Sequence, residues 1–311
     1  MTYLAFLNSM LKKEVADREN LVAFGQNIAA GSYLGGLTAG ISVSSGSRII
    51  NTINAENSLV GFGFGLALSG TDAIFFMRQI DFLLLAADQL VNTYNSIRNR
   101  PGGIPASFTI MTTVIDQGYE GPQSSLNNLG DFCSLAHIDA FTVTNKADME
   151  KIIPAKLIAP GFRIIAASPR LYKTEIIEPR SLVYYSPRLD FFEYRKGDDA
   201  TIVCFNLSFP YGYALSEEMQ KNGIHPALFS VNVSVPIELG VILESVKKTK
   251  KLIILDDGKS MNCSYHTLIA EARLYTLLKE IIITRKLGDN WLTPNPDHFE
   301  IDYQKIIQDI V

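Results

Sequence analysis

The stretch INAENSLVGFGFGLALSG, residues 53–70, is the most informative part of this 311-residue chain and decides its expected fold. It predicts a helix that begins near Glu56, with Asn54 as its N-cap and Gly70 where it stops. Three glycines lie inside this helix, at Gly61, Gly63 and Gly65. Because a glycine inside a helix costs roughly 1 kcal/mol relative to alanine, we expect another element to pack closely against it. The helix dipole stabilises a carboxylate at this end, so the simplest interpretation of Glu56 is a capping charge.

Strands alternate with helices on either side of this stretch. Strand-like apolar runs are expected at 21–24, 73–77, 107–114, 140–144 and 163–167. Helical patterns are expected at 4–15, 56–69, 81–98 and 147–158, and a long glycine-rich loop at 25–47. This order predicts an α/β domain with a mainly parallel sheet that helices cover on both faces.

A second α/β unit is expected after residues 168–198, where prolines interrupt the alternation. That segment is interpreted as a linker with one strand near 182–185. The second unit is expected to hold strands near 201–205, 228–233, 252–256 and 281–285, and helices near 213–221, 238–248 and 262–280. The predicted domains are therefore residues 1–170 and 199–311, joined by a linker at 171–198.

Composition and charge argue against several classes of partner. The net charge is −4, from 28 basic and 32 acidic side chains, which favours neither nucleic acid nor an anionic membrane. Charged residues make up 19% and hydrophobic residues 47%, a balance that fits burial against partner subunits or a large α/β core. No signal peptide is expected, and no apolar run reaches the ~18 residues of a membrane span.

The three cysteines, Cys133, Cys204 and Cys263, are widely spaced and indicate no disulfide framework. We therefore expect a protein of the reducing cytoplasm. Cys263 and His266 are the only close Cys/His pair, and the chain has four histidines in all. Since a zinc site needs about four ligands, no metal site is predicted in this chain.

Several short segments, taken in order, resemble those of one enzyme family. They read Asn51-Thr52-Ile53-Asn54-Ala55-Glu56, then Ile80-Asp81-Phe82, then Asp88-Gln89-Leu90-Val91-Asn92, and finally ILESVKKTKKLIILDDG at residues 242–258. Together they resemble the beta subunit of the decarboxylating component of the pyruvate and branched-chain 2-oxoacid dehydrogenases, and more widely the transketolase group. The resemblance implies a first domain of the thiamine diphosphate, pyrimidine-binding type and a second domain like the C-terminal domain of transketolase.

The resemblance also implies roles for individual residues. Glu56 matches the carboxylate that lies beside a ring nitrogen of the cofactor's aminopyrimidine and promotes formation of the reactive ylid. Phe82 matches the aromatic residue on which that ring stacks, although an aromatic residue in an apolar helix is more often part of the core. Asn54 and Arg78 fall among the cofactor-binding positions. Arg78 is interpreted either as a salt-bridged interface residue or as a partner of a substrate carboxylate or phosphate.

Two features depart from the family's pattern. In the expected substrate and acceptor loop, Ser124, which follows Gln123, stands where the family has a histidine associated with passing the acyl group to a lipoyl arm. Serine is no general acid or base near neutral pH, which argues against lipoyl acylation. The family's magnesium motif, Gly-Asp-Gly followed later by Asn, has no complete counterpart in the sequence. Thiamine diphosphate and Mg²⁺ are therefore expected to be held mainly by an alpha-type partner subunit.

These interpretations predict the beta half of a split thiamine diphosphate enzyme, in a heterotetramer of two alpha-type and two beta-type subunits. It is expected to cleave a 2-oxoacid or a ketose and to transfer an acyl or ketol unit. One alternative is an oxidoreductase of the pyruvate dehydrogenase type that feeds a lipoyl domain. Another is a pathway-specific, transketolase-like transferase whose acceptor is a carrier-protein thiol or a sugar. A non-catalytic structural subunit is a third alternative, and the presence of Glu56 argues against it.

Overall fold

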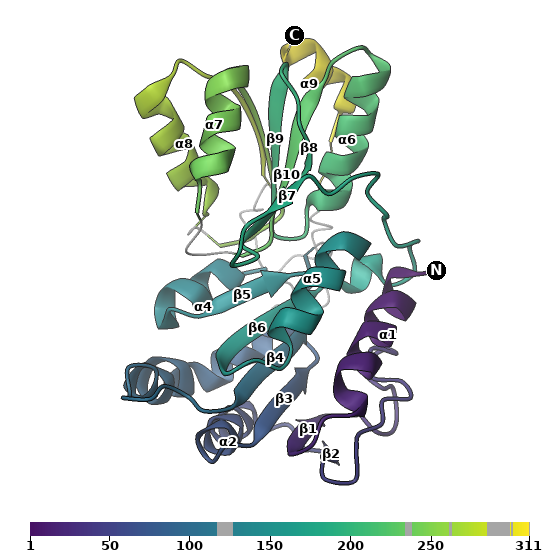
Figure 1. Ribbon diagram of the computed structural model, residues 1–311, viewed down its shortest axis with the longest axis vertical. Coiled ribbons are helices and arrows are strands. Elements are labelled where there is room, and N and C mark those ends of the chain that lie inside the picture. Colours follow the sequence, from purple (N-terminus) through teal and green to yellow (C-terminus); the bar gives the residue numbers. More distant parts are fainter. Residues whose placement is uncertain (117–126, 234–237, 261–262, 285–298, 300, 311) are drawn as a thin grey trace, which may run out of the picture.

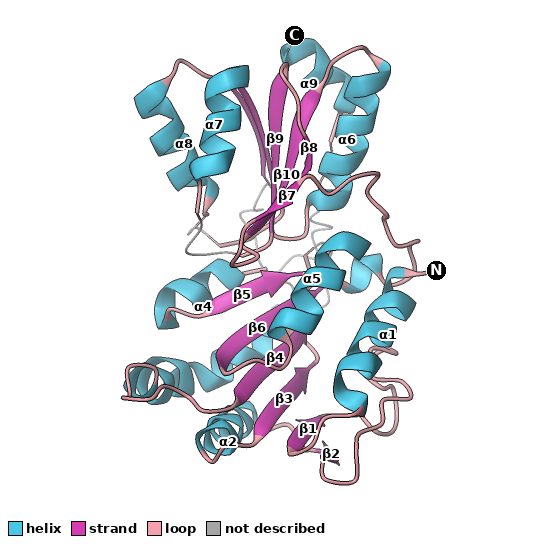
Figure 2. Ribbon diagram, in the orientation of Figure 1, coloured by secondary structure: helices cyan, strands magenta, loops and turns pink. Residues whose placement is uncertain are grey.

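In the computed structural model of the chain, two six-stranded sheets lie one above the other and helices flank each sheet (Figures 1 and 2). The structure describes residues 1–116, 127–233, 238–260, 263–284, 299 and 301–310. This arrangement confirms the α/β class that the alternation of strands and helices predicts.

Parallel pairing runs through the whole first sheet, whose strand order is β2-β1-β3-β4-β6-β5. Its strands are β1 (Leu21–Gly25), β2 (Arg48–Asn51), β3 (Asp72–Met77), β4 (Ser107–Thr113), β5 (Asp139–Thr142) and β6 (Gly161–Ala167). Successive side chains of a strand point to opposite faces, so Ile74 and Phe76 enter one core cluster while Phe75 and Met77 enter another. Both faces of this sheet are buried, as is usual for parallel sheets.

Helices cover the two faces of the first sheet as the alternation of strands and helices predicts, and one of them, at 129–136, lies outside the expected helical ranges. The main ones are α1 (Tyr3–Ala16), α2 (Glu56–Leu68), α4 (Leu129–Ala136) and α5 (Lys146–Lys156). α1 and α5 share the core cluster of Phe76, whereas α2 and α4 share that of Phe75. The stretch expected as one helix at 81–98 is instead a 3-10 segment, a π-helical turn and a short α-helix, namely η1 (Ile80–Ala86), η2 (Gln89–Tyr94) and α3 (Asn95–Ile97). A further short turn, η3 (Pro169–Leu171), follows β6.

The second sheet is mixed, with the strand order β12-β11-β9-β10-β8-β7. Its strands are β7 (Tyr184–Tyr185), β8 (Phe191–Arg195), β9 (Ala200–Phe205), β10 (Pro226–Val231), β11 (Lys251–Asp256) and β12 (Lys279–Thr284). β8 runs antiparallel to both β7 and β10, and the other pairs are parallel. Among the described residues, α6 (Phe209–Lys221) and α9 (Tyr303–Ile310) lie on one face of this sheet, and α7 (Gly240–Thr249) and α8 (Tyr265–Tyr275) lie on the other.

The structure corrects several predicted elements of the second half. The segment 171–198, expected as a linker with one strand, contains β8 as well as β7, and both strands belong to the second sheet. α8 ends at Tyr275, earlier than the expected 280, and α9 was not predicted at all. In the first half, β2 was also missed. The domain boundaries near residues 170 and 199 stay a prediction.

Buried polar side chains join the two halves of the chain. Asp148 of α5 accepts hydrogen bonds from Thr144, Asn145 and the Asn232 amide, the last at 3.0 Å from beyond β10. The Asn145 amide also donates to the hydroxyl of Tyr194 in β8, at 2.8 Å. Burial raises the pKa of Asp148 to about 7, while its hydrogen bonds lower it. These contacts fix the second sheet against α5.

α2 lies unusually close to β4, as its glycines predict. A Cβ atom built on Gly63 would lie 2.2 Å from Cζ of Phe108, so only glycine fits there without movement. Gly65, by contrast, has no other atom within 4 Å of such a Cβ. The predicted N-cap is wrong: the cap residue is Ala55, which has no side-chain hydrogen bond, and Asn54 lies one residue earlier. The helix stops as expected, with Gly70 in the left-handed region at φ +85°.

Candidate functional site

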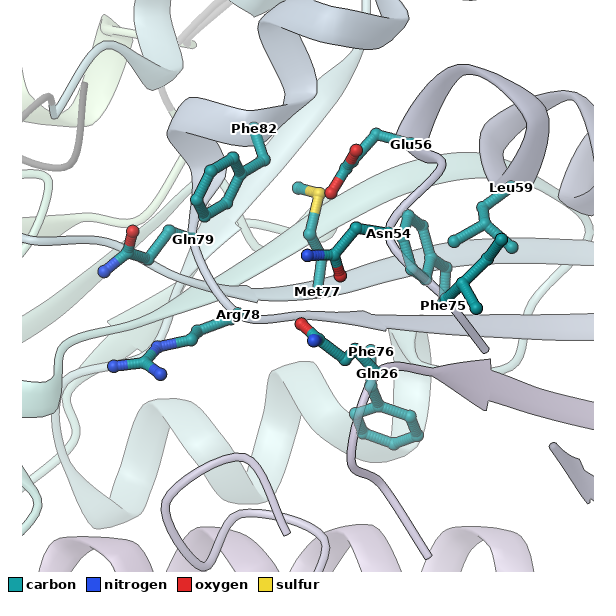
Figure 3. Close-up of a pocket in the computed structure, with 11 residues that line it drawn as sticks. Gln26, Asn54, Glu56, Leu59, Phe75, Phe76, Met77, Arg78, Gln79 and Phe82 are labelled. Carbon is teal, nitrogen blue, oxygen red and sulfur yellow. The ribbon is translucent and has the colours of Figure 1, made fainter. Parts of the chain in front are cut away.

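A cavity of about 320 Å³ opens where the first sheet reaches the carboxyl ends of β1 and β3 (Figure 3). Eleven residues line it: Gln26, Ile53, Asn54, Glu56, Leu59, Phe75, Phe76, Met77, Arg78, Gln79 and Phe82. The chain leaves β1 toward β2 on one side and returns over α2 to β3 on the other. Such a reversal of strand order leaves a crevice at the carboxyl ends of the strands, which is where α/β proteins bind ligands.

Glu56 reaches this cavity from the first position of α2. Its side chain is half-buried, and among the described residues no hydrogen bond or ion pair engages its carboxylate. The close contact of α2 with β4 fixes the helix, and with it the position of this carboxylate.

Aromatic and apolar side chains form the walls around Glu56. Phe82, from η1, is partly buried and packs against the core cluster of α2. In Figure 3 the Phe82 ring and the Glu56 carboxylate both extend from the upper wall of the hollow. Phe75 and Met77 of β3 are buried below them, and the Phe75 ring stacks on Phe24 with 5.1 Å between ring centroids. The cavity therefore combines an apolar floor with a single carboxylate.

Arg78 and three amide side chains supply the rest of the polar lining. Arg78 directly follows β3 and is exposed, whereas the neighbouring Gln79 is buried. Gln26 directly follows β1, and Asn54 lies in the turn before α2. In Figure 3 the Arg78 guanidinium extends to the side away from Glu56. The cavity thus has one acidic and one basic lining residue, held apart.

Three other features were sought in the described part of the chain: a metal-binding cluster, a reactive thiol and a membrane-spanning helix. No group of three or more His, Cys, Asp or Glu side chains is placed there to hold a metal ion. Burial raises the pKa of the Cys263 thiol to about 11, so it is protonated near neutral pH. Within the described ranges, no helix combines the length and apolar character that crossing a bilayer requires.

Comparison with known proteins identifies the relatives of this chain. The "Pyruvate dehydrogenase E1 component subunit beta" of Rhizobium meliloti (strain 1021) is 24% identical over 267 residues, which cover 83% of this chain and 56% of that protein. The "2-oxoisovalerate dehydrogenase subunit beta" of Bacillus subtilis (strain 168) is 22% identical over 282 residues, 89% of this chain and 86% of that protein. A solved structure described as "Split gene transketolase, inactive beta4 tetramer" has a TM-score of 0.65 and 14% identity, covering 99% of this chain and 95% of that one. No protein-family model matches the chain.

The chain is similar to proteins named as beta subunits of 2-oxoacid dehydrogenases. It spans little more than half of the Rhizobium protein, at 56% of its length. The likeness to split-gene transketolase, at 14% identity, shows the fold. The predicted resemblance to such a beta subunit, with a transketolase-like fold over the whole chain, is thereby confirmed.

The structure brings four of the predicted site residues together. Glu56, Phe82, Asn54 and Arg78 all line the same cavity, although they come from two separate segments, one at the start of α2 and one after β3. Gln123 and Ser124 lie outside the described residues. The roles of all six remain predictions.

Gln26 also lines the cavity, although it was not among the predicted site residues. A signal for it exists, because Gln26 directly follows a buried strand and ligands gather at the carboxyl ends of parallel strands. Gly25 before it has φ +152°, and a Cβ there would lie 2.2 Å from the carbonyl oxygen of Phe76. That close approach of β1 to β3 places Gln26 at the rim of the cavity.

Proposed function

We propose that this chain is the pyrimidine-binding, beta-type half of a split thiamine diphosphate enzyme. The holoenzyme would cleave a 2-oxoacid or a ketose and transfer the resulting acyl or ketol unit. The observation that carries this proposal is the Glu56 carboxylate, which lines one cavity together with Phe82 and has no protein partner among the described residues.

The lining residues fit the aminopyrimidine half of this cofactor. Glu56 would hold or release a proton beside a ring nitrogen, Phe82 would offer an aromatic face, and Phe75 and Met77 would exclude water below the ring. When bound, thiamine diphosphate supplies the stabilisation of a carbanion that no side chain can provide. The protein's part is to orient the ring and to exchange a proton at the Glu56 carboxylate.

A partner subunit is part of the proposal. Large apolar side chains of the segment 53–91 are exposed, namely Ile53, which lines the cavity, and Phe62, Leu84, Leu85 and Val91, and exposed apolar surface of this kind marks interaction sites. The sequence has no complete magnesium motif, so an alpha-type subunit would hold Mg²⁺ and the diphosphate. We infer a heterotetramer of two such pairs. We place it in the cytoplasm, in keeping with the free thiols of all three cysteines.

The acceptor decides between an oxidoreductase and a transferase. The family relationship favours a 2-oxoacid dehydrogenase that feeds a lipoyl domain. Ser124, in place of the family's histidine, favours a transferase whose acceptor is a carrier-protein thiol or a sugar. The rate of lipoyl acylation and the rate of donor cleavage therefore have to be measured separately.

Replacing Glu56 in the assembled enzyme tests the proposal. Glu56→Gln keeps the size of the side chain but removes the carboxylate, and we expect turnover to fall about 100-fold or more, as when a positioned proton-transfer group is lost. Cofactor affinity, measured by titration calorimetry, should change far less. The matched control is Asn57→Gln, at the next and exposed position of α2, which should retain turnover. Near-normal turnover of Glu56→Gln would return Glu56 to a capping charge.

A further inference from the structure

We propose that Arg78 is the anion-binding residue of this cavity and selects a donor that carries a carboxylate or a phosphate group. This inference rests on the proposed function and names the substrate class of the same site. The ligand chemistry is that of an oxyanion bound by a guanidinium. The donor substrate and the diphosphate of the cofactor are its two possible sources, and we assign it to the donor.

The position of Arg78 in the fold directs it to the ligand rather than to the core. Arg78 follows Met77, the last residue of β3, at the carboxyl end of a strand in the middle of the parallel sheet. Met77 is buried, and so is Gln79 on the other side. Arg78 alone of the three is exposed, and its side chain lines the cavity. The backbone here is anchored on both sides, so the guanidinium stands on a fixed base.

The charges around Arg78 leave it available for a ligand. No described carboxylate forms an ion pair with Arg78 within 4.0 Å, and Glu56, the one acidic residue of the lining, lies on another side of the hollow (Figure 3). Two half-buried arginines of this chain, by contrast, have protein partners: Arg170 pairs with Asp116, and Arg195 pairs with Glu217. Among the described residues, nothing competes with an incoming oxyanion for the Arg78 guanidinium.

The remaining polar lining suits this assignment. Gln26, Asn54 and Gln79 carry neutral amides, which neither repel an anion nor neutralise Arg78. A guanidinium presents parallel N–H donors that match a carboxylate or phosphate, and such charge-assisted pairs are roughly twice as strong as neutral hydrogen bonds. Lysine lacks this planar fork and is no equivalent replacement. The separation of Arg78 from Glu56 also keeps a bound anion away from the carboxylate that handles the proton.

The test compares anionic and neutral donors in the holoenzyme assembled with its partner subunit. The variants are Arg78→Gln and Arg78→Lys, with Arg48→Gln as the control, because Arg48 is equally exposed but lies at the opposite end of the sheet, in the first position of β2. For 2-oxoacid and ketose phosphate donors, we expect KM to rise about 10- to 100-fold in Arg78→Gln, the range for lost hydrogen bonds to a charged group. For a neutral 2-hydroxyketone donor, KM should stay within about twofold.

The results for the two Arg78 variants either support the proposal or overturn it. Arg78→Lys should recover part of the affinity for anionic donors, and both variants should bind thiamine diphosphate with unchanged affinity in calorimetry. An equal loss for neutral and anionic donors, or no loss for either, would overturn the proposal. Weaker cofactor binding at unchanged donor KM would assign Arg78 to the diphosphate instead. If the native complex bound no cofactor at all, the proposed function itself would fall.

Discussion

The substitution Gly63→Ala tests how tightly α2 is held against β4. The added methyl group would start 2.2 Å from the ring of Phe108, whereas ordinary contact begins at 3.4 Å. The ring has no room to move away, because it is fully buried and packs against Phe64 and Phe162, each with 5.0 Å between ring centroids. The helix and the strand must therefore separate by about an ångström, or the aromatic cluster must repack.

Two opposing terms set the size of the effect. Alanine in place of glycine favours a helix by about 0.5–1 kcal/mol. Forcing an extra methyl group into a filled core costs typically about 1–3 kcal/mol. The cost here should lie at the upper end of that range, because the Phe108 ring is held in place by its aromatic neighbours. We therefore expect Gly63→Ala to lower the free energy of unfolding by about 2 kcal/mol. Gly65→Ala, with open space around it, should raise that free energy by about 0.5–1 kcal/mol.

Equilibrium urea unfolding of the chain and its variants measures both effects. The two substitutions are chemically identical and lie two residues apart in one helix, so each is the control for the other. Adding Phe108→Leu to Gly63→Ala should recover part of the loss, since it removes ring atoms at the point of contact. The reasoning would be refuted if Gly63→Ala were as stable as Gly65→Ala, or if Phe108→Leu made the loss larger than the sum of the single changes.

Three further predictions concern charge, pH and the acceptor. Arg163→Met should lower the free energy of unfolding by about 3 kcal/mol. The buried guanidinium of Arg163 donates to two hydroxyls and two backbone carbonyls, which would lose their partner. A loss below about 1 kcal/mol in urea unfolding would contradict this prediction. The pKa of Asp148, raised to about 7, exceeds its unfolded value of about 4, so its stabilising contribution is full below pH 4 and is lost as pH rises through 7. The difference in unfolding free energy between the native chain and Asp148→Asn should accordingly fall from pH 4 to 8, and a flat difference would exclude this linkage. With Ser124 unmodified, donor cleavage followed with an artificial electron acceptor should outpace lipoyl acylation by orders of magnitude, and rapid acylation would return the enzyme to the dehydrogenase class.

Local patterns determined much of what the sequence predicted. Leu7, Leu11 and Val15 recur at helical spacing and are fully buried along one side of α1. The glycines of α2 predicted that another element packs closely against this helix, and Phe108 of β4 lies next to Gly63. Such features follow from the period of a helix or strand, which is set by residues a few positions apart and can be read from one chain.

Elements that depend on contacts with distant parts of the chain could not be predicted from the sequence. β8 lies among prolines and turns, and it is a strand because it pairs with β10, more than thirty residues later. The apolar run at 81–98 satisfies the pattern of one helix, yet the chain forms three short pieces there, of which η1 and η2 contact α2 and η2 also contacts α4. The N-cap of α2 fell on Ala55 rather than Asn54, since a cap depends on the local path of the chain and not on residue preference alone.

The candidate site, too, was predicted in part from the sequence and determined in part by the tertiary structure. The sequence by itself, through its family resemblance, proposed Glu56, Phe82, Asn54 and Arg78, because short motifs keep their order along the chain. Tertiary structure alone decided that these four share one cavity, that Gln26 joins them from β1, and that Arg78 stands apart from Glu56 without a described partner. The physical reason is that a parallel sheet brings the carboxyl ends of strands from distant parts of the chain to one edge, where their side chains meet.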